Sequence, residues 1–348
     1  MRKKRINLWP LFSLLLAVVS IWAVVSQSGK WSLLDMLESL READPRYLAA
    51  AVLCAALFVV LEGFSLRRLL KSVGIRKSRR RGLLYSAADV YFSAITPSAT
   101  GGQPASAFFM ISDGVPAGTA TAVLLCNLIL YTLSMLVAVL GCAAFGWRRL
   151  AGFQLLSKLL IGAGFLVLAV LALLFVWLLL RGDRAFSALR RLLGWLGRIG
   201  WIRRRQSKLQ RLDAIQSDFE SCVGLMRGKT KGLLLAFLCN LGQRASQIAV
   251  PMFFYLALGG RLSRAASVFE AQCFATVGYS IVPVPGAMGV ADYLMLDAFS
   301  ELVGMEEAVR LEMLSRGLSF YLCVLASALI TALGYLIMRR KKREESAK

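Results

Sequence analysis

The segment at residues 96–104, with the sequence TPSATGGQP, restricts the fold of this chain more than any other feature. It lies inside an otherwise apolar region, residues 83–112, yet it cannot be part of a plain membrane helix. Pro97 and Pro104 each lack a backbone N–H, and two adjacent glycines disfavour helix. Hydrocarbon tolerates irregular backbone only where that backbone is buried in protein or lines a wet cavity. The segment therefore predicts a re-entrant hairpin: a half-helix in, a turn of small residues and a half-helix out.

A second interruption of the same kind occurs at residues 283–289, with the sequence PVPGAMG, inside the apolar run 268–299. Four of the eight prolines of the chain lie in these two places. The same reasoning predicts a second hairpin, which extends to about residue 303.

Composition places the chain among polytopic membrane proteins, because 57% of its 348 residues are hydrophobic and its mean hydropathy is +0.63. The net charge of +22 does not indicate a nucleic-acid partner, since the basic residues cluster between apolar runs. The chain has no histidine, which removes the usual general base and zinc ligand. Its seven cysteines form no CxxC pair and are interpreted as buried apolar residues. No cofactor and no metal site is expected.

We expect an all-α polytopic membrane protein with about six full transmembrane helices plus two re-entrant helical hairpins. The predicted spans are residues 8–26, 47–66, 117–141, 159–180, 232–258 and 314–338. The first run is interpreted as a retained helix, because no small-x-small cleavage site of a signal peptide is clear. Residues 27–46 are expected to form a polar loop, and Pro116 to begin a helix.

Basic residues set the expected orientation. With the N-terminus in the cytoplasm, 31 of the 42 basic residues fall on the cytoplasmic side, in the N-terminal arm, residues 67–81, residues 181–231 and the tail 339–348. This holds only if each hairpin returns to the side that it came from. The two halves, residues 1–145 and 146–338 of one membrane domain, then contain two spans, a hairpin and a span in the same order. Their orientations in the membrane are opposite. That pattern is typical of an inverted repeat with a substrate site near the bilayer midplane.

The orientation gives a first testable prediction. A reporter fused after Lys348 that is active only outside the cytoplasm should stay inactive, and a cytoplasmic reporter at the same position should be active. The reverse result would contradict the topology and the inverted repeat with it.

The loop at residues 181–231 contains two amphipathic segments rich in arginine. They are expected to pack on the membrane surface or on the helix bundle. Their basic charge also suits anionic lipid headgroups, at about 1 kcal/mol for each Lys or Arg near the surface.

The first turn offers two kinds of ligand for an anion. Its hydroxyl and amide groups come from Thr96, Ser98, Thr100, Gly101, Gly102 and Gln103. We expect Pro104 at the first position of the outgoing half-helix, whose N-terminus would attract phosphate. The alternative is a tight turn that needs small residues only for packing or for a positive φ.

The second turn is expected to form the opposite wall of the site. Its candidate residues are Pro285, Gly286 and Gly289, and the turn runs into Asp292 on the following half-helix.

Ionisable residues at membrane depth are costly and serve as functional hypotheses. Arg244 lies deepest in a confident span, and its planar fork could bind a lipid phosphate. The alternative is an ion pair with Glu62 or Glu270 that only fixes helix packing. Glu62 could instead pair with Arg67. The other candidates are Asp89, and Asp297 and Arg316, which could both lie near the outer surface.

Three segments together, residues 96–104, 226–229 and 284–292, resemble the lysylphosphatidylglycerol synthase transmembrane-region family, the flippase-like membrane part of MprF-type proteins and their stand-alone relatives. The resemblance implies a bacterial inner-membrane protein that handles phospholipid headgroups and moves anionic or aminoacylated phosphatidylglycerol across the bilayer. The second turn departs from the family pattern, because a Gly-rich turn followed by Glu would be expected where this chain has Pro-Gly-Ala-Met-Gly and Asp292. Only ten residues follow Met338, so the soluble aminoacyl-transfer domain is not expected here.

Three functions stay open from the sequence. The first is a lipid translocase with its site between the hairpins and a membrane phospholipid as partner. The second is a phosphatidylglycerol lysyltransferase, but the chain offers no soluble domain and no histidine for that chemistry. The third is a transporter of small anions or solutes, which an inverted repeat would equally allow. A homo-oligomer and a separate soluble lipid-modifying enzyme are the further partners considered.

Overall fold

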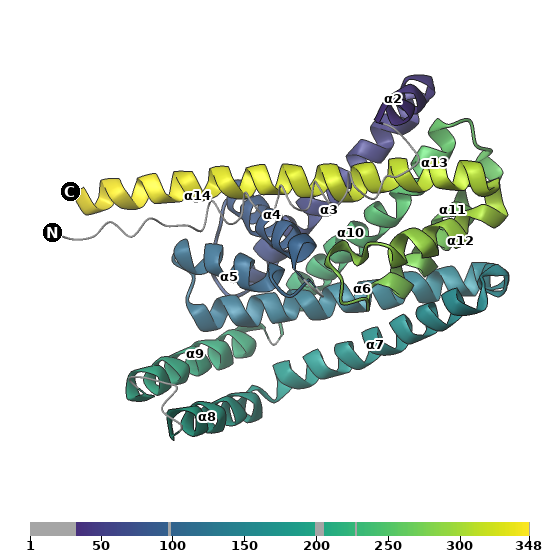
Figure 1. Cartoon of the computed structure of the whole chain (residues 1–348). Coiled ribbons are helices and arrows are strands. Elements are labelled where there is room, and N and C mark those ends of the chain that lie inside the picture. Colours follow the sequence, from purple (N-terminus) through teal and green to yellow (C-terminus); the bar gives the residue numbers. More distant parts are fainter. Residues whose placement is uncertain (1–32, 97–98, 199–204, 227, 348) are drawn as a thin grey trace.

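The computed structural model describes residues 33–96, 99–198, 205–226 and 228–347, and this part of the chain is built from helices (Figure 1). The prediction of an all-α polytopic membrane protein is confirmed. The helices are α2 (Leu33–Glu42), α3 (Pro45–Ser72), α4 (Arg79–Ile95), α5 (Gly102–Ser112), α6 (Ala117–Gly152), α7 (Leu155–Leu180), α8 (Gly182–Arg198), α9 (Arg205–Met226), α10 (Thr230–Ala257), α11 (Leu262–Tyr279), the short η2 (Pro285–Ala287), α12 (Val290–Val303), α13 (Met305–Arg316), the π-helical η3 (Gly317–Leu322) and α14 (Cys323–Ala347).

Within the described residues, five helical segments are long and apolar enough to cross a membrane: α3, α6, α7, α10 and Met305–Arg340. They match the predicted spans, but most extend beyond them. The apolar run sets the part that suits hydrocarbon, whereas backbone hydrogen bonding continues the helix into polar residues. The first predicted span, residues 8–26, lies outside the described residues.

The expected polar loop at residues 27–46 is corrected by the structure, because it contains α2. The next helix, α3, begins where Asp44 accepts a hydrogen bond from the Arg46 amide at 2.8 Å and Pro45 occupies the first helical position. Proline fits there because its missing N–H would have no intrahelical acceptor. The polar composition of this segment therefore hid a short helix with an amphipathic pattern.

Chain direction alternates between two ends of the molecule. The ends of α5 and α14 and the α8–α9 pair lie at one end, and α2, α11 and α13 lie at the other (Figure 1). The basic segments near residues 67–81, residues 181–231 and the C-terminus thus share one end. This arrangement agrees with the expected orientation, which stays a prediction because no membrane is present to define a side.

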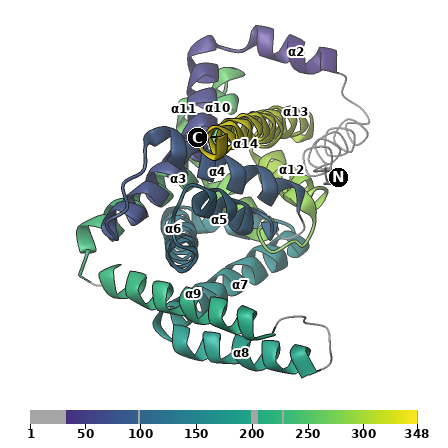
Figure 2. The same cartoon turned by 90° about the vertical axis from the view of Figure 1, so that its left-hand side faces the viewer.

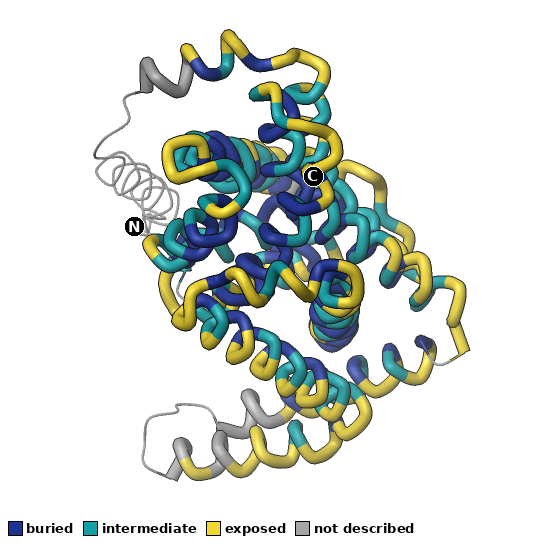
Figure 3. Tube along the Cα trace, turned by 90° about the vertical axis from the view of Figure 1, so that its right-hand side faces the viewer, coloured by how far each residue is buried: buried dark blue, intermediate teal, exposed yellow. Residues whose placement is uncertain are grey.

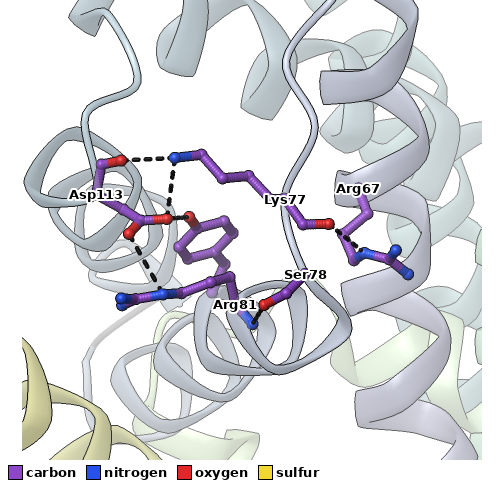
Figure 4. A network of polar contacts seen from close by, with 6 residues as sticks. Arg67, Lys77, Ser78, Arg81 and Asp113 are labelled. Atoms are coloured by element: carbon purple, nitrogen blue, oxygen red, sulfur yellow. Dashed lines mark hydrogen bonds and ion pairs between the residues drawn. The ribbon is translucent and has the colours of Figure 1, made fainter.

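The first hairpin consists of α4, the turn at residues 96–101 and α5, and its two far ends are tied together by Asp113 (Figure 4). The Asp113 carboxylate lies 3.1 Å from Lys77 Nζ and 3.3 Å from Arg81 Nε. It also accepts a hydrogen bond from the Tyr85 hydroxyl at 2.6 Å, while Lys77 Nζ donates to the Asp113 carbonyl. The chain therefore leaves α5 beside the point at which it entered α4.

Replacing Asp113 by alanine should destabilise the first hairpin, because it leaves Lys77, Arg81 and the Tyr85 hydroxyl without this acceptor. Hydrogen bonds to charged groups contribute about 1.5–3 kcal/mol, so we expect a clear fall in the thermal midpoint in detergent. The matched control is Asp213→Ala, which removes an exposed pair with Arg190 and should cost about 0–1 kcal/mol. Equal midpoints for the two variants would contradict this role.

The second hairpin consists of α11, the turn that contains η2, and α12. Its far ends are also held together, since Arg264 Nη1 donates to the Leu302 carbonyl at 3.1 Å. Both segments are helix–turn–helix elements whose far ends lie together. That they are re-entrant hairpins in a bilayer stays a prediction.

The last span differs from its prediction at its start. A single candidate span begins at Met305, and α13 passes into α14 through the π-helical segment Gly317–Leu322. π-Helical segments often occur at functional sites. Arg316, the last residue of α13, is buried in the protein, and its expected position near the outer surface of the membrane stays a prediction.

The core lies where α3 and α10 pack side by side, with α6 next to both. Ser65, Asn127 and Asn240 join these three helices in a buried network, with Ser65 Oγ 2.6 Å from Asn127 Oδ1 and Asn240 Nδ2 2.8 Å from Ser65 Oγ. Buried residues follow this centre, and exposed residues cover the outer helices (Figure 3). The exposed large apolar side chains are mostly leucine, with valine next, as expected for a lipid-facing surface.

The amphipathic loop forms a pair of helices, α8 and α9, at one end of the molecule (Figure 2). Leu212, Phe219, Cys222 and Met226 are buried, and α9 approaches α6 so closely that a Cβ on Gly118 would overlap the α9 backbone. The prediction that this segment packs on the bundle is confirmed for α9. On α8, Leu189 and Trp195 are exposed, as an interfacial position would require.

Candidate functional site

Arg244 lies on α10 in the centre of the core, with only 4% of its surface exposed. Its guanidinium lies over the ring of Tyr131 at 4.1 Å and over that of Phe58 at 5.1 Å. Desolvated cation–π contacts of this kind contribute about 2 kcal/mol. The Nε atom of Arg244 has no hydrogen-bond partner among the described residues. A buried charge that keeps a free donor is costly and indicates a binding role.

Two carboxyl groups lie near Arg244. Glu62 on α3 and Asp89 on α4 both interact electrostatically with its guanidinium, and they are hydrogen-bonded to each other. Glu62 Oε2 also accepts hydrogen bonds from Ser86 Oγ and from Gln243 Nε2, each at 3.2 Å. The alternative in which Glu62 pairs with Arg67 is therefore wrong; Arg67 Nε donates to the Lys77 carbonyl.

The first turn contacts this cluster through Asp89. Gln103 Nε2 lies 3.4 Å from Asp89 Oδ1, and a Cβ on Gly102 would overlap the same carboxylate. The turn and Arg244 therefore share Asp89 as a common neighbour. Gly102 needs to be glycine because of this close approach, since its φ is not positive.

Two details of the first turn correct the sequence expectations. The Gly101 amide is not free, because it donates to Thr96 Oγ1 at 2.9 Å, and Thr96 donates in turn to the Phe92 carbonyl. Helix α5 begins at Gly102, so Pro104 is its third residue, not its first. Proline is tolerated there because the first turn of a helix has no acceptor for its N–H. Thr100 is exposed at the tip, and Ser98 lies outside the described residues.

The second turn is built around Arg316. Its Nε lies 2.9 Å from Asp292 Oδ1 and 3.7 Å from Glu312, while Nη2 donates to the Gly286 carbonyl at 3.3 Å. The Phe320 ring lies 5.3 Å from the guanidinium. Asp292 also accepts from the Gly289 amide at 2.9 Å, which caps α12. The candidate residues Gly286, Gly289 and Asp292 thus belong to one cluster, with Pro285 beside them as the first residue of η2.

The two clusters adjoin each other. Helix α4 of the first hairpin contacts η2 of the second turn. Tyr279, at the end of α11, interacts electrostatically with both Arg244 and Arg316, and its hydroxyl lies 3.1 Å from Thr276 Oγ1. The expectation that the two turns face a common site is therefore consistent with the packing.

Each turn also contains one strained residue. Ala99 has a φ of 54° and Ala287 a φ of 50°, and among the described residues they are the two non-glycine positions with positive φ. Strain of this kind costs about 1–3 kcal/mol and clusters at functional sites. No sequence signal pointed to either alanine, because alanine normally avoids this conformation.

We expect Ala99→Gly to leave the thermal midpoint nearly unchanged. Relief of the strain offsets the larger entropy that glycine adds to the unfolded chain, about 0.4–1 kcal/mol. The comparison is Ala214→Gly on the exposed side of α9, which should cost about 1 kcal/mol because glycine weakens a helix interior. Equal losses for both variants would show that Ala99 is not strained.

Glu270 lies away from Arg244. It pairs with Arg149 of α6 at 2.8 Å, so the alternative of a Glu270–Arg244 ion pair is wrong. Asp297 accepts a hydrogen bond from the Gln154 amide at 3.0 Å, at the start of α7, and it is buried. Both residues join helices and do not contribute to the cluster around Arg244.

Sequence reasoning missed the aromatic and amide groups of the site. Tyr131 and Tyr279 occur in apolar runs, where nothing separates them from core residues. Gln243 and Gln247 are polar residues within the predicted span 232–258. Each has a buried Oε1 without a hydrogen-bond partner among the described residues. Their spacing of four residues places them on one face of α10.

Comparison with known proteins decides the family. The model of the lysylphosphatidylglycerol synthase TM region matches residues 11–327. The chain belongs to this family. It is also similar to a UPF0104 membrane protein of Archaeoglobus fulgidus, with 24% identity over 274 residues that cover 76% of this chain and 79% of the relative. Family membership identifies a lipid-related, multi-pass membrane protein and confirms the resemblance that the turn segments indicated.

Proposed function

We propose that this protein is a flippase-like translocase of anionic or aminoacylated phosphatidylglycerol. The observation that supports it most is the free, buried Nε donor of Arg244, held on two aromatic rings beside the first turn. Guanidinium groups bind phosphate with planar, two-pronged geometry. A phospholipid phosphate is therefore the ligand that this arrangement suits.

The groups around Arg244 also suit a cationic headgroup. The Glu62 and Asp89 carboxyls and the free Oε1 atoms of Gln243 and Gln247 are acceptors, which an ammonium group would satisfy. One donor for a phosphate beside several acceptors for an ammonium favours aminoacylated phosphatidylglycerol over the unmodified lipid.

Arg244 is covered in the described conformation, so a headgroup reaches it only after neighbouring helices move. The order α3, α4, turn, α5, α6 recurs as α10, α11, turn, α12, α13–α14, and the second set runs in the opposite direction (Figure 1). Rocking of two such halves about a central site is the usual route of alternating access. The proposal therefore assigns the movement to the two hairpins, whose neighbouring arginines, Arg244 and Arg316, both interact with Tyr279.

The test is lipid movement in proteoliposomes. Lysylphosphatidylglycerol with a fluorescent tail is placed in one leaflet, and its appearance in the other is followed with an impermeant quencher. The proposal predicts that the protein makes the exchange of lysylphosphatidylglycerol faster than in protein-free liposomes. For the uncharged diacylglycerol analogue, the protein should increase the exchange rate less over the rate in protein-free liposomes. Exchange equal to protein-free liposomes for every phospholipid tested would contradict the proposal.

The two alternatives from the sequence have less support in the structure. Phosphatidylglycerol lysyltransferase activity would need groups that activate an aminoacyl ester, and the Arg244 cluster consists of binding groups. A small-anion transporter would fit Arg244 but would leave the acceptors Gln243 and Gln247 without a purpose. Uptake of radiolabelled phosphate without any lipid movement would favour the transporter.

A further inference from the structure

Two acids that share one hydrogen bond lie at the centre of the candidate site. Glu62 and Asp89 come from different helices, and their carboxyl groups are hydrogen-bonded to each other. Such a bond requires a proton, because two ionised carboxylates are acceptors only. Glu62 on α3 is buried and Asp89 on α4 is half-buried, and α3 packs against both α4 and α10. The geometry thus describes a site that holds one proton.

The proton balances the local charge. With one proton on the pair, the remaining carboxylate and the Arg244 guanidinium sum to zero. Without it, the cluster would have a net negative charge in a medium where unbalanced charge is costly. Loss of this proton therefore needs another positive charge in its place.

Among the described residues, no other group near the pair can replace this proton's positive charge close to neutral pH. Arg244 is permanently charged, and cysteine and tyrosine side chains ordinarily keep their protons there. The titratable and charged groups that face the pair or its neighbour Arg244 from the other packed helices are Arg244, Tyr131, Tyr279, Cys323 and, beyond Tyr279, Arg316.

We infer that the Glu62–Asp89 pair is a proton-binding site that exchanges its proton for the ammonium group of an aminoacylated lipid headgroup. This inference rests on the proposed function. The carboxylic O–H bond breaks and the proton passes to water, while the ammonium N–H groups donate to the two carboxylates and to the free Gln243 and Gln247 oxygens. The proton that leaves and the ammonium that enters carry the same charge, the second ammonium of the lysyl group balances the lipid phosphate on Arg244, and no other bond changes.

Translocation then becomes coupled to protons. Each cationic headgroup that leaves the site must be replaced by a proton, so lipid and proton move in opposite directions through the alternating halves. A transmembrane proton gradient would provide the energy source for lipid movement in this scheme.

Isothermal titration calorimetry tests the exchange directly. The purified protein is titrated with lysylphosphatidylglycerol, and separately with phosphatidylglycerol, in two buffers of different ionisation enthalpy at about pH 6, where the lysyl ε-amine is fully charged. The comparison of the two buffers gives both the affinity and the number of protons released. We expect release of about one proton per lysylphosphatidylglycerol bound, the stoichiometry of one ammonium for one shared proton, and none for phosphatidylglycerol.

Two variants locate the released proton. Glu62→Gln and Asp89→Asn each keep the size of the side chain and remove one ionisable group. Either variant should therefore abolish proton release. If Glu62→Gln does not fold, Asp89→Asn alone provides the test. Glu301→Gln, an exposed carboxylate on α12, is the control and should release protons as the wild type does. Release that persists in both folded variants, or that also occurs with phosphatidylglycerol, would overturn the inference.

The result separates this inference from the proposed function. Binding of lysylphosphatidylglycerol without proton release would overturn the exchange and leave lipid handling intact. Absence of binding for both lipids would overturn both.

Discussion

Replacing Arg244 by lysine should lower the rate of lipid translocation about tenfold to a hundredfold while the protein still folds. Lysine keeps the positive charge beside Glu62 and Asp89, but it loses the planar fork that stacks on Tyr131 and presents Nε to a phosphate. Charge-assisted hydrogen bonds contribute about 1.5–3 kcal/mol, which corresponds to this range of rates. The measurement is the proteoliposome exchange rate of lysylphosphatidylglycerol.

Two further variants make this prediction specific. Arg68→Lys, on an exposed part of α3, is the matched control and should leave the rate unchanged. Arg244→Met removes the charge and leaves the shared carboxyls unbalanced, so it should abolish translocation. Full activity of Arg244→Lys together with a folded Arg244→Met variant would show that Arg244 neither binds the lipid nor forms a needed charge interaction.

Gly102→Ala should lower both stability and translocation, and Gly102→Leu should prevent folding of the first hairpin. A Cβ at this position overlaps the Asp89 carboxylate and the Ser93 hydroxyl, and it lies 2.7 Å from the Asp89 carbonyl oxygen, which belongs to rigid α4 backbone. Overpacking of this kind costs about 1–3 kcal/mol. The displaced Asp89 would also lose its alignment with Glu62 and Gln103, so the loss of activity should exceed the loss of folded protein.

Gly141→Ala on α6 is the matched control, because a Cβ there meets no atom within 4 Å. Alanine should raise stability slightly at that helical position. The thermal midpoint in detergent and the proteoliposome rate are measured for both variants. An unchanged midpoint for Gly102→Ala would contradict the close approach of α5 to α4.

The sequence predicted most of the fold because membrane helices depend on local properties. Apolar runs located the described spans, and the Pro/Gly segments at residues 96–104 and 283–289 located both hairpins. It missed α2 because a short amphipathic helix in a polar segment has no strong signal. It also placed the start of the last span too late, since α13 is polar and joins α14 only through the η3 segment.

The site was predicted less completely because its geometry depends on contacts between distant helices. Arg244 stood out as a charge in an apolar span, but the sequence could not choose between Glu62 and Glu270 as its neighbour. Only packing of α3 against α10, and of α11 against α6, assigns Glu62 to Arg244 and Glu270 to Arg149. The reason for glycine at position 102 was also out of reach, because it depends on the distance to Asp89 and not on the turn itself.

The most direct test of a lipid site at Arg244 is native mass spectrometry of the purified protein. The account predicts that wild-type protein retains one phospholipid with a phosphate and an ammonium headgroup, enriched over the surrounding membrane, and that Arg244→Met loses this lipid while staying folded. Bound lipid that mirrors the bulk membrane composition, or equal retention by Arg244→Met, would contradict a headgroup site at Arg244.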